Sequence, residues 1–396
     1  MFVLTILITY GTVSTFGNIL KAGDMSVENF IESNAQFTAD LYKEISGLSY
    51  GKSFLFSPFS VEEILASVWS GSKGKTALEI QRTLHLPDKY EDIETVFQSI
   101  LPKLKSNNNL YNLTLANRIY VKDTFVINPI YKKRAKQIYS VDVENLNFNE
   151  AEIASAYINR WIEKQTNYRI NNLLSPDELT DLTQLLLINT LYFGGKWEKN
   201  FNDPLTTTKK IFYNSAADKV EVDTMSMRDT LRYYECHAAK ILELPYEGEE
   251  ISMIIVLPNA ADGWKNLTNF SDDIFKYPNY TLEYVHVELP RFSISYTIDF
   301  KHTLQKLGIV TAFNKADFGR IINITTEDVA ISSVLQKTYI NVTEDGTEAA
   351  VASSGLVASL ASVSEEEPTK YFIADHPFLF YIRSPFGILF VGQYTG

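Results

Sequence analysis

The chain has 396 residues, of which 45% are hydrophobic and 13% aromatic, and its formal net charge is −12. This length is enough for one large domain or two ordinary ones, and the composition allows a sizeable core. The acidic balance argues against nucleic-acid binding. Short basic runs are usually solvated faces, so we do not expect a heparin-like polyanion to bind Lys103 and Lys105, or Lys132, Lys133 and Arg134.

The N-terminal residues 1–17 have the pattern of a signal peptide. Phe2 to Ile8 is mostly apolar, and the small residues Thr15 and Gly17 follow it, which predicts cleavage near Gly17. No basic segment precedes the apolar run, so a buried N-terminal strand is the alternative. No other run is long and apolar enough to span a membrane. We therefore expect a secreted, extracellular protein.

The N-terminal half of the chain has helical periodicity. Apolar residues share one stripe over Ser26 to Ile45, and helices are also predicted over Val61 to Ser70, Thr76 to Leu84 and Ala151 to Thr166. Ser175 to Leu182 begins with Ser-Pro-Asp, which signals a helix start.

Strands dominate from Leu185 onward. Runs such as Met253 to Leu257 and Ile388 to Val391 are short and wholly apolar, which is typical of buried strands. Helices come mainly first and strands mainly later, and this order predicts an α+β fold. We find no internal repeat and expect one domain over residues 18–396.

The sequence assembles no active site. The five histidines are scattered, and no metal motif, phosphate loop or nucleophile elbow occurs, which argues against a hydrolase. Cys236 is the only cysteine, so no intramolecular disulfide can form. Its neighbour His237 would suit a nucleophile, but Tyr233 to Glu235 alternate as a strand does. We expect no enzyme, no metal and no cofactor.

Asn-x-Ser/Thr sequons support secretion only weakly, because such tripeptides also arise by chance. The candidate glycosylation sites are Asn112, Asn266, Asn269, Asn279 and Asn323, and a sixth sequon begins at Asn341. Asn112 and Asn341 lie in predicted strands and are the least suited to carry glycan.

The segment from Glu344 to Ser354 joins an acidic, glycine-containing start to a run of small side chains. Gly346 supplies a hinge, because glycine visits backbone angles that other residues avoid. Composition alone fits a flexible Ala/Ser linker. Small residues also suit a backbone that must slide into a tight slot inside a β-sheet.

Ten short segments, spread along nearly the whole chain, match segments of a known protein family in the expected order. They are Phe56 to Ser60, Leu65-Ala66, Gly71 to Thr76, Leu113 to Tyr120, Ile188 to Trp197, Leu244 to Tyr246, Met253 to Pro258, Leu289 to Phe292, Phe372 to Phe380 and Ile388 to Gln393. Together with the hinge, they resemble a serpin, a member of the serine protease inhibitor superfamily.

The resemblance implies a single α+β serpin domain with three β-sheets, about eight to nine helices and an exposed reactive-centre loop at about residues 344–368. It also implies a physical mechanism. The loop is bait for a protease, which cleaves it and forms a covalent acyl-enzyme. The freed loop end then inserts into the main sheet as an added strand. The expected partner is a target protease, and we expect the inhibitor to be a monomer.

By the same resemblance, the hinge of the loop contains Glu344, Gly346 and the residues that follow. Alternate side chains face the core in an inserted strand. The inward set is Thr347, Ala349, Val351 and Ser353, and the outward set includes Glu348, Ala350 and Ala352. The inward set is small, with Val351 the largest. This favours an inhibitor over a non-inhibitory carrier or storage serpin.

Family spacing from Glu344 places the scissile bond between Leu360 and Ala361. Leucine before the cut suits chymotrypsin-like and some elastase-like serine proteases. If the register shifts by one residue, Leu360 becomes the next-to-last residue before the cut, which suits papain-like cysteine proteases. The sequence leaves both alternatives open.

The resemblance also places Ser57, Ser60, Asn189 and Gln336 in a cluster that controls how the central strands part. The family commonly has a histidine where this chain has Gln336. Glutamine still donates and accepts hydrogen bonds, but the pH response of a histidine is absent. Tyr168 stands where the family usually has a glycine after a helix.

Overall fold

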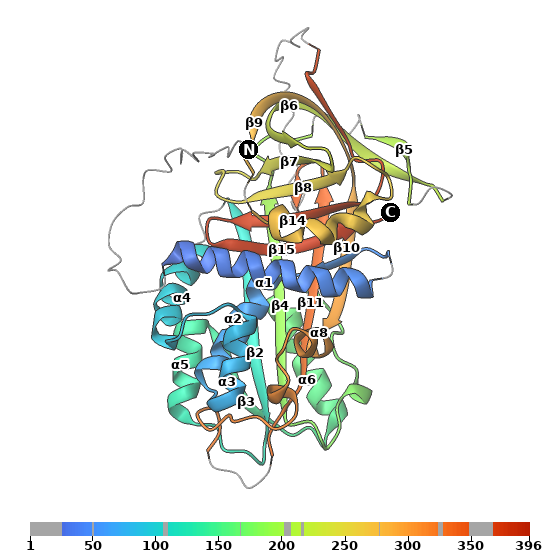
Figure 1. The fold of residues 1–396 in the computed structure, drawn as a ribbon. Coiled ribbons are helices and arrows are strands. Elements are labelled where there is room, and N and C mark those ends of the chain that lie inside the picture. Colours follow the sequence, from blue (N-terminus) through green and yellow to red (C-terminus); the bar gives the residue numbers. More distant parts are fainter. Residues whose placement is uncertain are drawn as a thin grey trace.

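The computed structural model describes residues 26–49, 51–105, 110–166, 168–201, 207–214, 218–276, 278–323, 328–347 and 367–396. The predicted signal peptide and the segment 348–366 lie outside these residues. Within them the chain forms the expected α+β fold (Figure 1). No helix of the described residues is long and apolar enough to cross a membrane.

Eight α-helices form in this part of the chain, in agreement with the eight to nine expected. They are α1 (Val27–Leu48), α2 (Pro58–Ser70), α3 (Gly74–Thr83), α4 (Tyr90–Leu104), α5 (Pro129–Tyr139), α6 (Ala151–Gln165), α7 (Ser271–Ile274) and α8 (Lys301–Lys306). α2 begins at Pro58 rather than Val61, because the Ser57 side chain caps it and proline suits the first helical position. The sequence patterns did not predict α4, α5, α7 or α8.

The helix predicted over Ser175 to Leu182 is wrong. Only Pro176–Glu178 form a turn of 3-10 helix. The start signal is present, since the Ser175 amide donates to Glu178 Oε2 at 2.7 Å, but Leu179 already has extended backbone. Nucleating a helix is costly, so a start signal without a continuing apolar stripe does not propagate.

In the described residues the main sheet has six strands. In spatial order they are β10 (Phe292–Asp299), β11 (Ile331–Thr343), β12 (Gly346–Thr347), β4 (Leu185–Lys196), β2 (Tyr111–Lys122) and β3 (Val141–Leu146). The long strands β2, β4 and β11 run lengthwise through the molecule, and α1 crosses in front of them (Figure 1). The segments Leu113 to Tyr120 and Ile188 to Trp197, which resemble strands of the main serpin sheet, fall in β2 and β4.

The other nine strands form one continuous hydrogen-bonded network. They are β1 (Phe54–Phe56), β15 (Gly387–Tyr394), β14 (Phe378–Ser384), β8 (Ser252–Pro258), β7 (Ala239–Pro245), β6 (Val220–Glu235), β9 (Thr281–Pro290), β13 (Lys370–Ile373) and β5 (Thr208–Phe212). The long strand β6 joins two parts, because Arg232 and Tyr233 pair with β7 on one side and β9 on the other. Counting these parts separately gives the three sheets that the resemblance implied.

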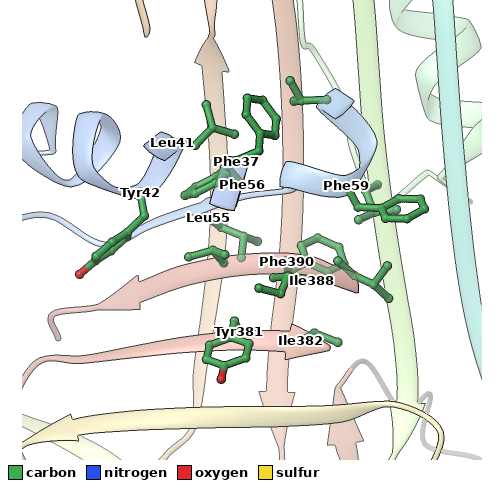
Figure 2. Packing of buried hydrophobic residues seen from close by; sticks show 14 of the residues in the cluster. Phe37, Leu41, Tyr42, Leu55, Phe56, Phe59, Tyr381, Ile382, Ile388 and Phe390 are labelled. Atoms are coloured by element: carbon green, nitrogen blue, oxygen red, sulfur yellow. The ribbon is translucent and has the colours of Figure 1, made fainter. Parts of the chain in front are cut away.

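The larger of two core clusters includes the interface between the first helices and the C-terminal hairpin. Phe37 and Leu41 of α1 and Phe59 of α2 pack with Ile388 and Phe390 of β15 (Figure 2). All these side chains are fully or almost fully buried.

A second cluster lies under α6. Ile158 and Ile162 of α6 pack with Leu186 and Ile188 of β4 and with Leu335 of β11. Because successive side chains of a strand point to opposite faces, Leu187 and Leu191 of β4 belong instead to the larger core. α6 therefore covers one face of the main sheet where β4 and β11 are neighbours, and α2 packs on the other.

Candidate functional site

The boundary between β11 and β4 differs along its length. From Ile331 to Tyr339, β11 pairs directly with β4 in parallel. Beyond this, β12 lies between them and is antiparallel to both, with Thr347 opposite Val342 of β11 and Gly195 of β4. The main sheet is thus parted at one end. The start of the predicted hinge occupies the gap, and the remaining hinge residues from 348 onward lie outside the described residues.

Gly346 is required where the chain turns into this gap. Its φ is +148°, a conformation that other residues rarely adopt. A Cβ atom at this position would lie 2.1 Å from the Gly195 carbonyl oxygen and 2.7 Å from Lys196 Cα. Both are backbone atoms of β4, so only glycine allows β12 to approach this strand.

Thr347 is fully buried at the parted end of the sheet. Its Oγ1 shares a 2.6 Å hydrogen bond with the Tyr246 hydroxyl. Tyr246 stacks on Trp197 with ring centroids 4.5 Å apart and meets Phe193 edge-on at 4.8 Å. Burial raises the pKa of Tyr246 far above its usual value. The first residue of the predicted inward set therefore lies in an aromatic pocket that offers one hydroxyl group and no space for a long side chain.

Glu344 anchors the turn between β11 and β12. Its buried carboxylate accepts a 2.5 Å hydrogen bond from Thr207 Oγ1 and faces Arg291 Nε at 3.4 Å. Trp197 braces the same turn, because its indole Nε1 donates to the Thr343 carbonyl oxygen and its amide donates to that of Asp345. The entry point of the loop is thus held on both sides.

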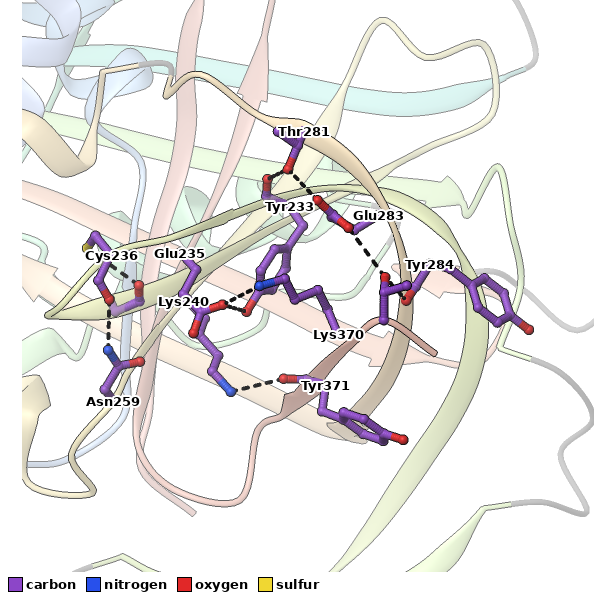
Figure 3. A network of polar contacts seen from close by, with 12 residues as sticks. Tyr233, Glu235, Cys236, Lys240, Asn259, Thr281, Glu283, Tyr284, Lys370 and Tyr371 are labelled. Carbon is purple, nitrogen blue, oxygen red and sulfur yellow. Dashed lines mark hydrogen bonds and ion pairs between the residues drawn. The ribbon is translucent and has the colours of Figure 1, made fainter. Parts of the chain in front are cut away.

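The described chain resumes at Glu367 and enters β13, which lies along β9 and parallel to it (Figure 3). Here surface groups hold it. Lys370 pairs with Glu235 at 3.1 Å, and Lys240 Nζ donates to the Tyr371 carbonyl oxygen at 3.0 Å. The Thr369 hydroxyl donates to the Tyr284 carbonyl oxygen at 3.1 Å. Residues 348–366 are therefore bounded by an anchor in the main sheet and by another on β9.

The four residues assigned to strand parting are brought together, with Asn117 as a fifth member, and we call these five the shutter cluster. Asn117, Asn189 and Gln336 are direct neighbours across β2, β4 and β11. Gln336 Nε2 donates to Asn189 Oδ1, and Asn189 Nδ2 donates to both Asn117 Oδ1 and Ser60 Oγ. Ser57 binds Gln336 twice, through its amide at 2.7 Å and its carbonyl oxygen at 3.1 Å. All five residues are buried.

Sequence reasoning missed Asn117 and its partner Glu63. Asn117 Nδ2 donates to Glu63 Oε2 at 2.7 Å. Burial raises the pKa of Glu63 to about 7, although the positive charge of Lys105 and the Asn117 hydrogen bond oppose the shift. Both residues had a signal in the sequence. Asn117 interrupts an apolar strand, and Glu63 lies in a helix whose other residues are mostly apolar or small.

The remaining candidates lie at the surface or apart from these sites. Asn112, Asn266, Asn269, Asn279 and Asn323 are exposed, with Asn112 in β2 as predicted. Cys236 is partly buried, and its thiol contacts the Ala239 carbonyl oxygen at 3.5 Å. No group of three or more His, Cys, Asp and Glu side chains suited to a metal ion occurs in the described residues.

The main sheet has long strands, is parted at one end by β12 and has a buried polar cluster at its middle. This arrangement is that of a serpin domain. The family model described as serpin (serine protease inhibitor) matches residues 32–396, and the chain belongs to the serpin family. A serpin-like protein of Thermococcus kodakarensis is 36% identical, covering 97% of this chain and 89% of its own. The leukocyte elastase inhibitor of Homo sapiens is 32% identical, covering 93% and 100%.

Solved structures agree with this assignment. Serpin48 of the insect Tenebrio molitor, described as a highly specific serpin, matches with a TM-score of 0.86 and 40% identity, covering 94% of this chain and 100% of that one. Uncleaved ovalbumin matches with a TM-score of 0.82 and 25% identity over 93% and 99%.

Proposed function

We propose that this serpin is an inhibitor that traps its target protease as a covalent acyl complex by inserting its cleaved loop between β11 and β4. The observation that carries the proposal is β12, which already pairs with both strands at one end of the sheet. Each further inserted residue gains ladder hydrogen bonds worth on the order of 1 kcal/mol net. Over a dozen residues, roughly, this gain can exceed the cost of ordering the loop.

The register of β12 supports the assignment of the inward set. If β12 continues in register, residues 349, 351 and 353 fall on the same face as Thr347. Residue 349 then meets Ile340 and Phe193, residue 351 meets Thr338 and Leu191, and residue 353 meets Gln336 and Asn189. These neighbours are buried, so only small side chains at Ala349, Val351 and Ser353 fit between them.

We propose a chymotrypsin-like or elastase-like serine protease as the target, with the cut between Leu360 and Ala361. Family spacing supports this, and relatives named as leukocyte elastase inhibitors agree with it. A papain-like cysteine protease is the alternative outcome of the test, with the cut one residue later.

The test is to incubate the protein with chymotrypsin, elastase and papain and to look for complexes that survive SDS. The N-terminal residue of the released peptide then fixes the bond. Ala361 supports the serine-protease assignment, Ser362 supports the cysteine-protease alternative, and a start beyond Val363 contradicts both.

Cleavage by a protease that is not trapped tests insertion separately. We expect a clean cut within Leu356 to Ser362 to raise the melting temperature strongly, because the loop becomes a full strand of the main sheet. Intact protein treated with inactivated protease is the control. An unchanged melting curve after cleavage would contradict the inhibitor mechanism.

We also propose that the protein is secreted, from the apolar run Phe2 to Ile8. Expression in a eukaryotic secretory host tests this. A protein recovered from the medium with its N-terminus near residue 18 supports the proposal, and retention in the cell with an intact N-terminus contradicts it.

A further inference from the structure

Two adjacent glutamates on α2 are completely buried. Glu62 Oε2 accepts a hydrogen bond from Asn34 of α1 at 2.8 Å, whereas Glu63 Oε2 accepts one from Asn117 of β2 at 2.7 Å. The second carboxyl oxygen of each has no hydrogen-bond partner among the described residues. The two carboxyls are therefore alike in burial and bonding, but only Glu63 contacts the shutter cluster.

Through Glu63 the shutter cluster forms a closed circuit. It leaves α2 at Ser57, crosses the sheet through Gln336, Asn189 and Asn117, and returns to α2 at Glu63. The Gln336–Asn189 hydrogen bond spans the boundary at which β11 and β4 pair directly. A strand inserted there would separate β11 from β4 by an additional spacing of about 4.8 Å, so this bond has to break.

A second bond of the circuit has to break as well, because α2 cannot follow both halves of the parted sheet. Its N-terminal end is attached to β11. The Ser57 main chain makes two hydrogen bonds with the Gln336 side chain. Thr338 Oγ1 donates at 2.8 Å to the carbonyl oxygen of Leu55, which lies in β1, the strand that leads into α2. Among the described residues, the hydrogen bonds that attach α2 to Asn117 and Asn189 run from side chain to side chain. When β4 and β2 move away, Asn117 is therefore drawn from Glu63.

We infer that Glu63 is a positioning residue for loop insertion, whose carboxylate holds Asn117 in the closed sheet and takes up a proton from solvent when β2 moves away. This inference rests on the proposed insertion of the loop. It makes the parting of β11 and β4 depend on the protonation of Glu63 in α2. The histidine that the family commonly has at position 336 is absent from this chain.

The direction of the pH effect follows from linkage. In the closed sheet the pKa of Glu63 is about 7, and the Asn117 hydrogen bond lowers it. While the Glu63 carboxyl stays buried under α2, losing that bond raises its pKa further, so the open sheet binds the proton more tightly than the closed one. Opening is then favoured as the pH falls from 9 toward 7. The effect levels off below about pH 7, where both states are protonated.

Other charged or titratable groups on the surrounding elements have their own partners or lie on another face. Lys105, at the end of α4, is the charge that acts on Glu63. Five others are hydrogen-bonded to a partner: Glu62 to Asn34, Glu94 to Arg134, Tyr131 to Ser67, Tyr139 to Glu94, and Glu79 to Thr311. Arg118 stacks on Trp161 on the opposite face of β2. Asn117 and Asn189, which β2 and β4 contribute, carry no charge.

The experiment measures how fast a dye-labelled synthetic peptide with the sequence of residues 347–360 anneals into the uncleaved protein between pH 6 and 9. For the natural sequence we expect the rate to rise as the pH falls from 9 to 7, by at most about tenfold per unit for one proton, and then to level off. Glu63→Gln keeps an acceptor for Asn117 but cannot titrate, so its rate should be independent of pH in this range.

Glu62→Gln is the matched control. It removes an equally buried carboxyl one residue away, outside the circuit, and should keep the pH profile of the natural protein. Hydrogen exchange of the β11 amides between residues 333 and 339, corrected for intrinsic exchange, reports opening of the same boundary without peptide. Thermal unfolding checks that both variants are folded, and the unmodified protein alone already tests the sign of the pH effect.

The outcomes separate this inference from the proposed function. If the peptide anneals but Glu63→Gln keeps the natural slope, or the slope has the opposite sign, the role of Glu63 is wrong and insertion stands. If no variant anneals but the exchange of β11 depends on pH through Glu63 alone, the role of Glu63 stands and the proposed function fails. If neither readout depends on Glu63, the inference is overturned.

Discussion

At one end, which we call the hinge end, the boundary between β11 and β4 holds β12, whereas in the middle the same strands pair directly. The hinge end is lined by Gly195, Gly346 and the aromatic ring of Tyr246. The middle is lined by Gln336 and Asn189. A boundary of small residues and ring faces accepts a strand without losing hydrogen bonds. A boundary bridged by buried amides has to break them first, and each lost partner costs about 1–3 kcal/mol. The middle of the boundary is therefore the costlier part to open.

The largest effect is expected from Thr347→Arg at the hinge end. A guanidinium in the pocket of Tyr246 would be buried with one neutral hydroxyl group to pair with, at a cost of roughly several kcal/mol. The start of β12 would then leave the gap, and its re-entry would become part of the insertion step. Since each 1.4 kcal/mol slows a step about tenfold, insertion should fall behind deacylation. The variant should be cleaved as a substrate, and its SDS-stable complex should disappear.

Asp345→Arg is the control for this prediction, because Asp345 is exposed and lies two residues before Thr347. It introduces the same charge outside the pocket and should leave complex formation unchanged. If Thr347→Arg inhibits with unchanged stoichiometry, the assignment of the hinge is wrong.

Gly346→Ala should destabilise the uncleaved protein by about 3 kcal/mol, because its Cβ would overlap backbone atoms of β4. Chemical denaturation measures the change. In Gly47→Ala the new Cβ meets nothing within 4 Å, and alanine in a helix should stabilise by about 0.5–1 kcal/mol. Equal effects at the two glycines would show that the close approach at the hinge end does not matter.

Gln336→Leu tests the middle of the boundary. It leaves the Ser57 amide and Asn189 Oδ1 without partners, so we expect a loss of about 2 kcal/mol and faster peptide annealing. Gln393→Leu is the control, since the amide group of Gln393 is buried with no hydrogen-bond partner in the described residues. This control should be neutral or stabilising. A loss as large as that of Gln336→Leu would contradict the conclusion that the hydrogen bonds of Gln336 hold the middle of the boundary closed.

The smallest effect concerns Tyr168, an exposed residue that follows the end of α6. Its φ is +60°, a left-handed conformation that costs a residue with a side chain about 1 kcal/mol or more. Tyr168→Gly should raise the free energy of unfolding by about 0.5–1 kcal/mol. Tyr168→Ala removes the ring but keeps the Cβ atom, and it should bring no gain.

Much of the fold followed from local patterns in the sequence. The apolar stripe of Ser26 to Ile45 gave α1, and the apolar runs Met253 to Leu257 and Ile388 to Val391 became β8 and β15. Periodicity works here because each of these segments buries its own apolar residues wherever its neighbours lie. It failed at Ser175 to Leu182, where the start signal is satisfied by a single turn and no apolar stripe continues.

The sequence by itself determined the family and the residue types of the hinge. Small side chains suit a segment that enters a sheet, and a glycine suits the turn that leads into it. It also supplied four of the five residues of the shutter cluster, through resemblance. Only the tertiary structure decided that Thr347 is already buried and that Asn117 connects the shutter cluster to Glu63. The physical reason is that hydrogen bonds between residues far apart in sequence, such as Asn117 and Glu63, depend on strand register and on the placement of α2. Neither leaves a periodic pattern in the chain.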